Sequence, residues 1–303
     1  MWGVFNYQGI VVMASPFYFA IKGKFIIVGK EPDGDSVRFI ADNLDLYENL
    51  HRNYRIKPSR DGSVQLRFEG IDATEVHYGG AAQPLGTEAR DQLLDWMGFE
   101  NIQYKGNRVL SAEPDAVPGF ILSQAADANG RPISYVLLAG DAKKLEDGDW
   151  NKVDTALLKK TFNFKLLTQG LVYYTVYTST PFSHRKQFRE AALAARKANR
   201  GIWAQDSTEE FVLVDRQSIV APDGQVILPK LFRRSIDYLK AVDGGFRGNL
   251  QDWMIDISQG SRNENDRVLI RDAFEVKFSD LIEQRNSRVV FKEDILNITF
   301  VEK

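Results

Sequence analysis

Apolar and polar residues alternate in several short stretches of the first 205 residues, which is the pattern of strands that are buried on one face. An apolar run at 25–28 leads into a bend at Asp33-Gly34-Asp35, after which Val37 and Phe39 alternate with polar neighbours. Residues 64–69, VQLRFE, alternate throughout. The pattern predicts short β-strands that are connected by tight turns.

Helical spacing of apolar residues replaces this alternation at residues 87–98, 163–170 and 184–200. The first two stretches begin at residues that can cap a helix N-terminus, Thr87 and Asn163, and glycines end all three. The third is rich in alanine and has a strongly basic face. We expect helices at these positions.

Short strands on glycine-rich turns with a few helices predict a mainly β fold with added α structure, an OB-fold barrel with packed helices. The expected organisation is an N-terminal extension at 1–17, the barrel domain at 18–205, and a small α+β module at 206–303. The hairpin signal at 127–130, which contains Asn-Gly, lies inside the barrel domain.

The amino-acid composition excludes several classes of catalytic and metal sites. The 303 residues contain 39 basic and 41 acidic side chains, so the chain is no polybasic nucleic-acid coat. Cysteine is absent, which excludes disulfides, thiol nucleophiles and cysteine-based zinc sites. No nucleophile motif such as G-x-S-x-G supports a Ser-His-Asp mechanism, and the 3 histidines lack metal-ligand spacing. Hydrolytic chemistry would therefore depend on carboxylates, arginines and an oxygen-ligated metal.

The apolar N-terminal stretch has no Lys or Arg before Lys22. A secretory signal needs a positive region at its start, and a membrane span needs about 20 unbroken apolar residues. The stretch satisfies neither requirement, so we expect a cytoplasmic protein.

Taken one at a time, the candidate site residues have ordinary structural explanations. Asp33-Gly34-Asp35 is a typical turn sequence, although it could also aim a carboxylate at a metal. Arg67 within a strand is more often an ion-pairing surface residue, and Glu75 more often a loop carboxylate. Arg131 follows Asn-Gly as a turn flank would. Only their joint presence favours a catalytic site.

Six segments in order resemble motifs of the thermonuclease, or staphylococcal-nuclease-like, family. They are residues 33–37 (D-G-D-S-V), 67–75 (R-F-E-G-I-D-A-T-E), 86–89 (G-T-E-A), 130–131 (G-R), 169–171 (Q-G-L) and 191–203 (AALAARKANRGIW). Each motif alone is weak, but six in the family's order make coincidence very improbable. The resemblance extends over residues 18–205 and says nothing about 206–303.

The resemblance implies a phosphodiester hydrolase, a nuclease that depends on Ca²⁺ and acts on DNA and/or RNA. Asp35, Asp72 and the backbone carbonyl of Ala73 would bind the metal, which suits a cation that takes hard oxygen ligands. Asp33 would be an accessory acid near the metal.

The same resemblance assigns the catalytic roles. Arg67 and Arg131 would hold the phosphate and neutralise charge that develops in the transition state, because guanidinium offers paired donors. Glu75 would act as the general base toward the attacking water.

The nucleotide pocket departs from the family pattern. The positions of a family lysine and tyrosine before Gly-Arg hold Ala128 and Asn129, and a gapless count puts Val176 and Thr178 at two family tyrosine positions, with Tyr177 between them. We therefore expect weaker binding of short nucleotides. Longer nucleic acid would be held by these residues: Tyr177, Arg185, Lys186, Arg189, Lys197 and Arg200.

Other functions are compatible with the same sequence. The barrel could hold nucleic acid or a protein without cleaving it, although Asp35, Arg67 and Glu75 are all present. Alternatively, the acidic C-terminal module could be an interaction domain that localises or restrains the nuclease.

Overall fold

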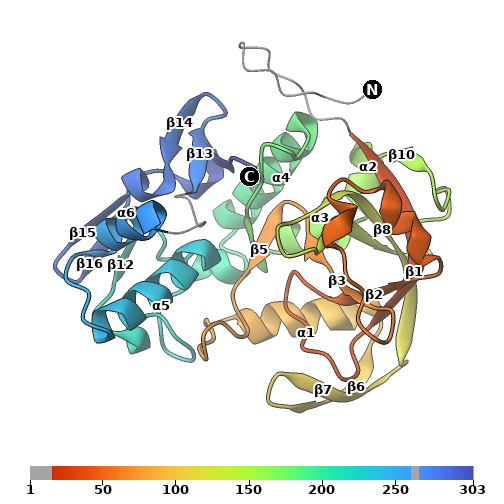
Figure 1. Cartoon of the computed structure of the whole chain (residues 1–303), viewed down its shortest axis with the longest axis horizontal. Helices are drawn as coiled ribbons and strands as arrows, with labels where there is room; N and C mark the ends of the chain where they lie inside the picture. The colour runs from red at the N-terminus through yellow and green to blue at the C-terminus, as the bar shows by residue number, and fades with distance from the viewer. Residues whose placement is uncertain (1–15, 261–265, 303) are drawn as a thin grey trace.

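The computed structural model describes residues 16–260 and 266–302 of the chain, so the predicted extension at 1–17 lies almost wholly outside the described residues. A curved, nearly closed sheet forms the barrel, with the strand order β3-β2-β1-β8-β9-β4 and with β10 paired to β1 (Figure 1). Its strands are β1 (Phe17–Ile26), β2 (Arg38–Ala41), β3 (Val64–Gln65), β4 (Arg67–Phe68), β8 (Ala116–Ala126), β9 (Pro132–Leu138) and β10 (Trp150–Lys152). The barrel fold predicted from the sequence is confirmed.

The alternating residues form the barrel core. Phe25 on β1 lies opposite Phe39 on β2, and their ring centres are 5.1 Å apart. Both side chains, and Phe68 on β4, are fully buried or nearly so. Alternation therefore set which face of each strand points inward, because successive side chains of a strand point to opposite faces.

The Asp-Gly-Asp segment forms a tight turn between β1 and β2. The amide of Asp33 donates to the carbonyl of Ser36 at 2.9 Å. A Cβ atom on Gly34 would lie 2.8 Å from the Cβ atoms of Ala73 and Ala89, so only glycine allows the turn to pack this closely. The turn is thus pressed against the strand and the helix that carry the other motifs.

Helices cover the barrel, three of them at the predicted positions, whereas the short helix at 155–158 is an addition that the sequence pattern did not predict. They are α1 (Gly86–Met97), α2 (Thr155–Leu158), α3 (Phe162–Thr168) and α4 (Phe182–Lys197). Both predicted caps are wrong: Leu85 precedes α1, and Thr161 caps α3 by accepting from the amide of Phe164. Asn163 instead donates to the carbonyls of Glu69 and Ser134, which are buried in the barrel domain.

Two further pairs of strands belong to this half of the chain. β5 (Ile71–Ala73) pairs antiparallel with β11 (Val172–Tyr174), and β6 (Glu100–Lys105) forms a hairpin with β7 (Arg108–Glu113). The β5–β11 pair matters for function because it places residues 71–73 beside the Asp-Gly-Asp turn.

Residues 206–260 and 266–302 form small sheets and helices to one side of the barrel (Figure 1). One sheet has the order β12-β16-β15 and another the order β14-β13-β17. The elements are β12 (Glu210–Val212), α5 (Pro229–Asp243), α6 (Leu250–Gly260), β13 (Arg267–Ile270), β14 (Phe274–Lys277), β15 (Ile282–Arg285), β16 (Arg288–Phe291) and β17 (Ile298–Phe300). We call this region the C-terminal module.

The C-terminal module is fastened to the barrel domain by backbone hydrogen bonds. The amide of Phe300 donates to the carbonyl of Val176 at 2.9 Å, and the amide of Thr178 donates to the carbonyl of Phe300 at 2.8 Å. Tyr177 packs its ring against Phe300 with 5.6 Å between ring centres. β17 therefore lies along residues 176–178, which follow β11. No helix among the described residues has the length and apolar character to cross a membrane.

Candidate active site

Four acidic side chains from three segments meet at one end of the barrel. Asp33 and Asp35 lie in the turn between β1 and β2, Asp72 lies on β5, and Glu75 follows in the next loop. The amide of Ala73 donates to Oδ2 of Asp35 at 3.3 Å, which ties the turn to β5. The carbonyl of Asp35 accepts from the amide of Phe68 at 3.0 Å. The motifs that the sequence separates are thus adjacent in space.

The acids are close enough to disturb one another. Burial, followed by the negative charges of Asp72 and Glu75, raises the pKa of Asp35 to about 7. Burial and the charge of Asp35 likewise raise the pKa of Asp33 well above its usual range. Burial also raises the pKa of Glu75, against the opposite effect of a nearby guanidinium. Such a cluster requires a compensating cation, because like charges out of water repel strongly.

The two predicted arginines border the acids, and each has a partner within the barrel domain. Arg67 donates from Nη2 to the hydroxyl of Tyr177 at 2.8 Å, and its guanidinium carbon lies 4.7 Å from the centre of that ring. Arg131 donates from Nε to Oδ2 of Asp127 at 2.8 Å. Arg131 is near enough to lower the pKa of Asp35, and Arg67 interacts electrostatically with Asp72.

A third arginine, Arg233 on α5, completes the site from the C-terminal module. Its Nη2 lies 2.8 Å from Oδ2 of Asp72 and its Nη1 lies 3.3 Å from Oδ1, so both carboxylate oxygens accept from it. Nη1 also contacts Oε1 of Glu75. The side chain of Arg233 is 29% exposed, whereas those of Asp72 and Glu75 are 12% exposed. The guanidinium therefore lies between two predicted functional acids.

Sequence reasoning missed Arg233. It predicted a small α+β module at 206–303 but gave no partner for Arg233, since Asp72 precedes Arg233 by 161 residues. Within α5, Leu231, Phe232 and Ile236 are buried, which shows the amphipathic pattern that the sequence does contain. That pattern gives the buried face of the helix but does not say what lies opposite it.

Further contacts join α5 to the loop that carries Glu75. The hydroxyl of Tyr78 donates to Oδ2 of Asp237 at 2.7 Å. Gln83 accepts from the amide of Glu75 at 3.1 Å and donates from Nε2 to the carbonyl of Ile227 at 2.8 Å. Gln83 is 2% exposed, so it connects Glu75 to the residues that precede α5 within the protein interior.

The fit of the site to Ca²⁺ depends on Arg233. Asp35, Asp72 and the carbonyl of Ala73 are hard oxygen donors of the kind that Ca²⁺ takes. However, both carboxylate oxygens of Asp72 accept from Arg233. Over residues 16–260 and 266–302, no group of three or more His, Cys, Asp or Glu side chains is arranged to hold a metal ion. With Arg233 in place, the donor set does not fit Ca²⁺.

Some basic side chains of α4 contact the C-terminal module. Arg185 contacts Asp272, and Arg189 contacts the side-chain carbonyl of Asn297. Four of the predicted phosphate-binding residues are exposed, namely Lys186, Arg189, Lys197 and Arg200. The sixth residue of that prediction, Tyr177, packs against Arg67. The predicted nucleic-acid surface stays a prediction, and the exposed residues are the ones that a substrate could reach first.

The departures of the nucleotide pocket have distinct structural settings. Val176 is fully buried, and Thr178 donates its amide to Phe300. Ala128 and Asn129 are exposed at the tip of the β8–β9 turn. The positions where the family stacks tyrosines are thus covered by β17.

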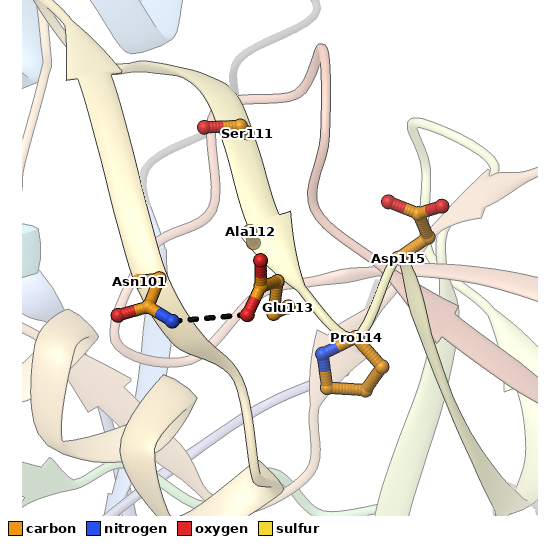
Figure 2. Close-up of a pocket in the computed structure, with 6 residues that line it drawn as sticks. All are labelled: Asn101, Ser111, Ala112, Glu113, Pro114 and Asp115. Atoms are coloured by element: carbon orange, nitrogen blue, oxygen red, sulfur yellow. Dashed lines mark hydrogen bonds between the residues drawn. The ribbon is translucent and has the colours of Figure 1, made fainter.

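Hollows elsewhere in the structure lie apart from the acids. Figure 2 shows one at the β6–β7 hairpin, where Asn101 donates from Nδ2 to Oε2 of Glu113 at 3.0 Å. None of the predicted site residues lines it. A much smaller hollow is bordered by Arg67, Tyr177 and Glu302, and none of the four acids lines it.

Comparison with known proteins agrees with the fold. Residues 65–205 match the family model described as staphylococcal nuclease homologue. This part of the chain is a staphylococcal-nuclease-like domain, and the family resemblance predicted from the motifs is confirmed. No curated protein matches the chain. The matched segment includes Arg67, Asp72, Glu75 and Arg131, whereas the turn with Asp35 precedes it.

Proposed function

We propose that the protein is a nuclease that hydrolyses phosphodiester bonds in DNA and/or RNA. The observation that carries the proposal is the convergence of Asp35, Asp72, Glu75 and two arginines from separate segments of a staphylococcal-nuclease-like domain. Buried acids that repel one another do not stabilise a fold. Their presence beside Arg67 and Arg131 is therefore better explained by a catalytic role.

Each side chain has a role that its position supports. Arg67 and Arg131 lie at the border of the acidic site, where they can hold a substrate phosphate and neutralise charge that develops on its oxygens. Glu75 is the candidate base for the attacking water, and the hydrogen bond from its amide to Gln83 fixes the loop that carries it.

The proposed cofactor is Ca²⁺, and the proposed substrate is nucleic acid. Asp35, Asp72 and the carbonyl of Ala73 would hold the ion once Arg233 has left Asp72, and the ion would then supply a Lewis acid for the phosphate. Lys186, Lys197 and Arg200 would contribute contacts to a longer nucleic acid, since they are exposed on or beside α4.

The test is digestion of plasmid DNA and of RNA by the full chain, with Ca²⁺ and with excess chelator. The Arg233→Gln variant is assayed in parallel, because in this variant no guanidinium from α5 engages Asp72 and Glu75. Cleavage should require Ca²⁺ and should be lost in Asp35→Ala and in Asp72→Ala. Full activity in chelator would refute the metal assignment, and no cleavage by either protein under any condition would refute the nuclease.

The engagement of Asp72 and Glu75 by Arg233 favours one alternative, a barrel that binds nucleic acid without cutting it. Under this alternative the ion pairs are permanent, and Arg67 and Arg131 only bind phosphate. Fluorescence anisotropy with labelled oligonucleotides separates the two functions. Tight binding by wild type and by Arg233→Gln, with cleavage by neither, would favour the binding protein.

A further inference from the structure

We infer that Arg233 is a tethered cation that occupies the acidic site and excludes a metal ion until α5 moves away. For its consequence on catalysis the inference rests on the proposed nuclease function. The inference concerns the C-terminal module, which lies outside the matched family segment at 65–205.

The first argument is geometric. A single guanidinium contacts both oxygens of Asp72 and one oxygen of Glu75. Asp72 is the predicted metal ligand, and Glu75 is the predicted base. One side chain therefore engages both the metal-binding and the proton-accepting parts of the site, and neither acid can serve its role while the contact lasts.

The second argument is electrostatic. Asp72 and Glu75 both contact the guanidinium of Arg233 and are only 12% exposed, so the positive charge between them offsets their mutual repulsion. Arg233 supplies that charge in this structure, and a divalent cation would supply it in its absence. The two cations compete for the same oxygens, so binding of one disfavours the other.

The third argument concerns how α5 is held over the site. Its apolar side chains, such as Leu231 and Phe232, are buried, whereas its contacts with the loop that carries Glu75 are polar. Tyr78–Asp237 is one such hydrogen bond, and it lies in a partly exposed place. The groups of this hydrogen bond can exchange for water at modest cost, so this contact does not by itself lock α5 over the site.

The neighbouring arginine provides a matched control. Arg234 has the same charge and lies next to Arg233 on α5, but its Nη2 pairs with Asp266 inside the C-terminal module at 3.1 Å. Lys230 also pairs with Asp266, so loss of Arg234 leaves that acid with a partner. Arg234→Gln therefore removes one positive charge from the helix without freeing the acidic site.

The experiment is calorimetric titration of the full chain with Ca²⁺, which does not depend on activity. Arg233→Gln should bind Ca²⁺ about tenfold or more tightly than wild type, because no tethered cation competes for Asp72. Arg234→Gln should bind within about twofold of wild type. Equal affinities for wild type and Arg233→Gln, or an equal gain in both variants, would overturn the inference.

A second variant serves if Arg233→Gln fails to fold. Tyr78→Phe removes only the hydrogen bond to Asp237 and leaves the acids and Arg233 intact. It should loosen α5 and raise Ca²⁺ affinity by roughly twofold to fivefold. Circular dichroism before titration establishes that each variant is folded. Unchanged affinity in folded Tyr78→Phe, together with failure of Arg233→Gln to fold, would make Arg233 a structural residue and overturn the inference.

Failure of the inference and failure of the proposed function give different results. Tighter Ca²⁺ binding by Arg233→Gln without any cleavage would support the tethered cation and refute the nuclease. Cleavage by wild type with an affinity equal to that of Arg233→Gln would support the nuclease and refute the tethered cation.

Discussion

The C-terminal module contacts the nuclease-like domain at two charged places of opposite sign. At the acidic site it supplies a cation, Arg233, to acids that are 12% exposed. At α4 it supplies an anion, Asp294, to Arg196, and both side chains there are about one third exposed, at 35% and 36%. The Arg196–Asp294 pair has good geometry, with two hydrogen bonds of 2.9 and 2.8 Å.

The difference teaches that charge complementarity alone does not measure the importance of a contact. Water screens the Arg196–Asp294 pair, so it should contribute little. Asp72 and Glu75 are largely shielded from water, so loss of Arg233 leaves them without compensation. The two contacts should therefore respond differently to matched substitutions.

The largest effect is expected for Glu75→Gln, measured in the Arg233→Gln background, where the acidic site is free. Loss of a positioned base should lower kcat by about 10²- to 10⁴-fold. The matched change at the α4 contact, Asp294→Asn, should leave kcat within about twofold because it touches no reacting group. Equal losses in both variants would show that cleavage does not take place at the acidic site.

Arg67→Lys and Arg131→Lys should come next, each with kcat lower by roughly 10²-fold. Lysine keeps the charge but loses the paired donors that match phosphate oxygens. Arg196→Lys at the α4 contact is the control and should change kcat by less than about twofold. Steady-state kinetics on a defined oligonucleotide measures all three, and near wild-type rates in Arg67→Lys and Arg131→Lys would remove both from the site.

Stability should separate the two contacts as well. In the presence of chelator, Arg233→Gln should lower the free energy of unfolding by about 2 kcal/mol, less than for a fully buried pair because its side chain is partly exposed. Arg196→Gln should lower it by less than about 1 kcal/mol. Urea denaturation measures both values. A larger loss in Arg196→Gln than in Arg233→Gln would reverse the comparison.

The smallest effect is expected for the exposed lysines of α4, Lys186 and Lys197, and concerns substrate binding. Because the stacking positions are covered, KM for dinucleotides should exceed that for oligonucleotides of about 20 residues by roughly tenfold, and kcat/KM should fall steeply with salt. Lys186→Gln with Lys197→Gln should remove most of this length dependence. An Ala128→Lys/Asn129→Tyr variant should have a lower KM for dinucleotides than wild type. Equal efficiency on both lengths, with no gain in that variant, would mean that other contacts bind the nucleotide.

Much of the nuclease-like domain was determined locally by the sequence. Alternation at 64–69 defined which side chains enter the barrel, and Gly98 and Gly170 end α1 and α3 where the sequence predicted. The charged motif residues could also be named, because short segments carry them in a fixed order. These features depend on neighbours in the chain, and local backbone preferences and periodicity report such neighbours directly.

Competition between partners decided features that the sequence left open. Thr161 and Asn163 are both acceptable helix caps, and local preference does not choose between them. Asn163 is fully buried beside β9, where it accepts from the amide of Val136 as well as donating to two carbonyls. A buried backbone group without a hydrogen-bond partner is costly, and Asn163 is the partner of the Val136 amide on β9. Thr161 therefore caps α3 instead.

Only the tertiary structure decided what compensates the acids. The motif residues predict a cluster that needs a cation, and the sequence alone favours a metal ion for that purpose. Arg233 reaches Asp72 because the apolar side chains of α5 are buried in the protein interior and because β17 is hydrogen-bonded to residues 176–178. A pairing between residues so far apart follows from how two folded surfaces pack, which no local pattern encodes.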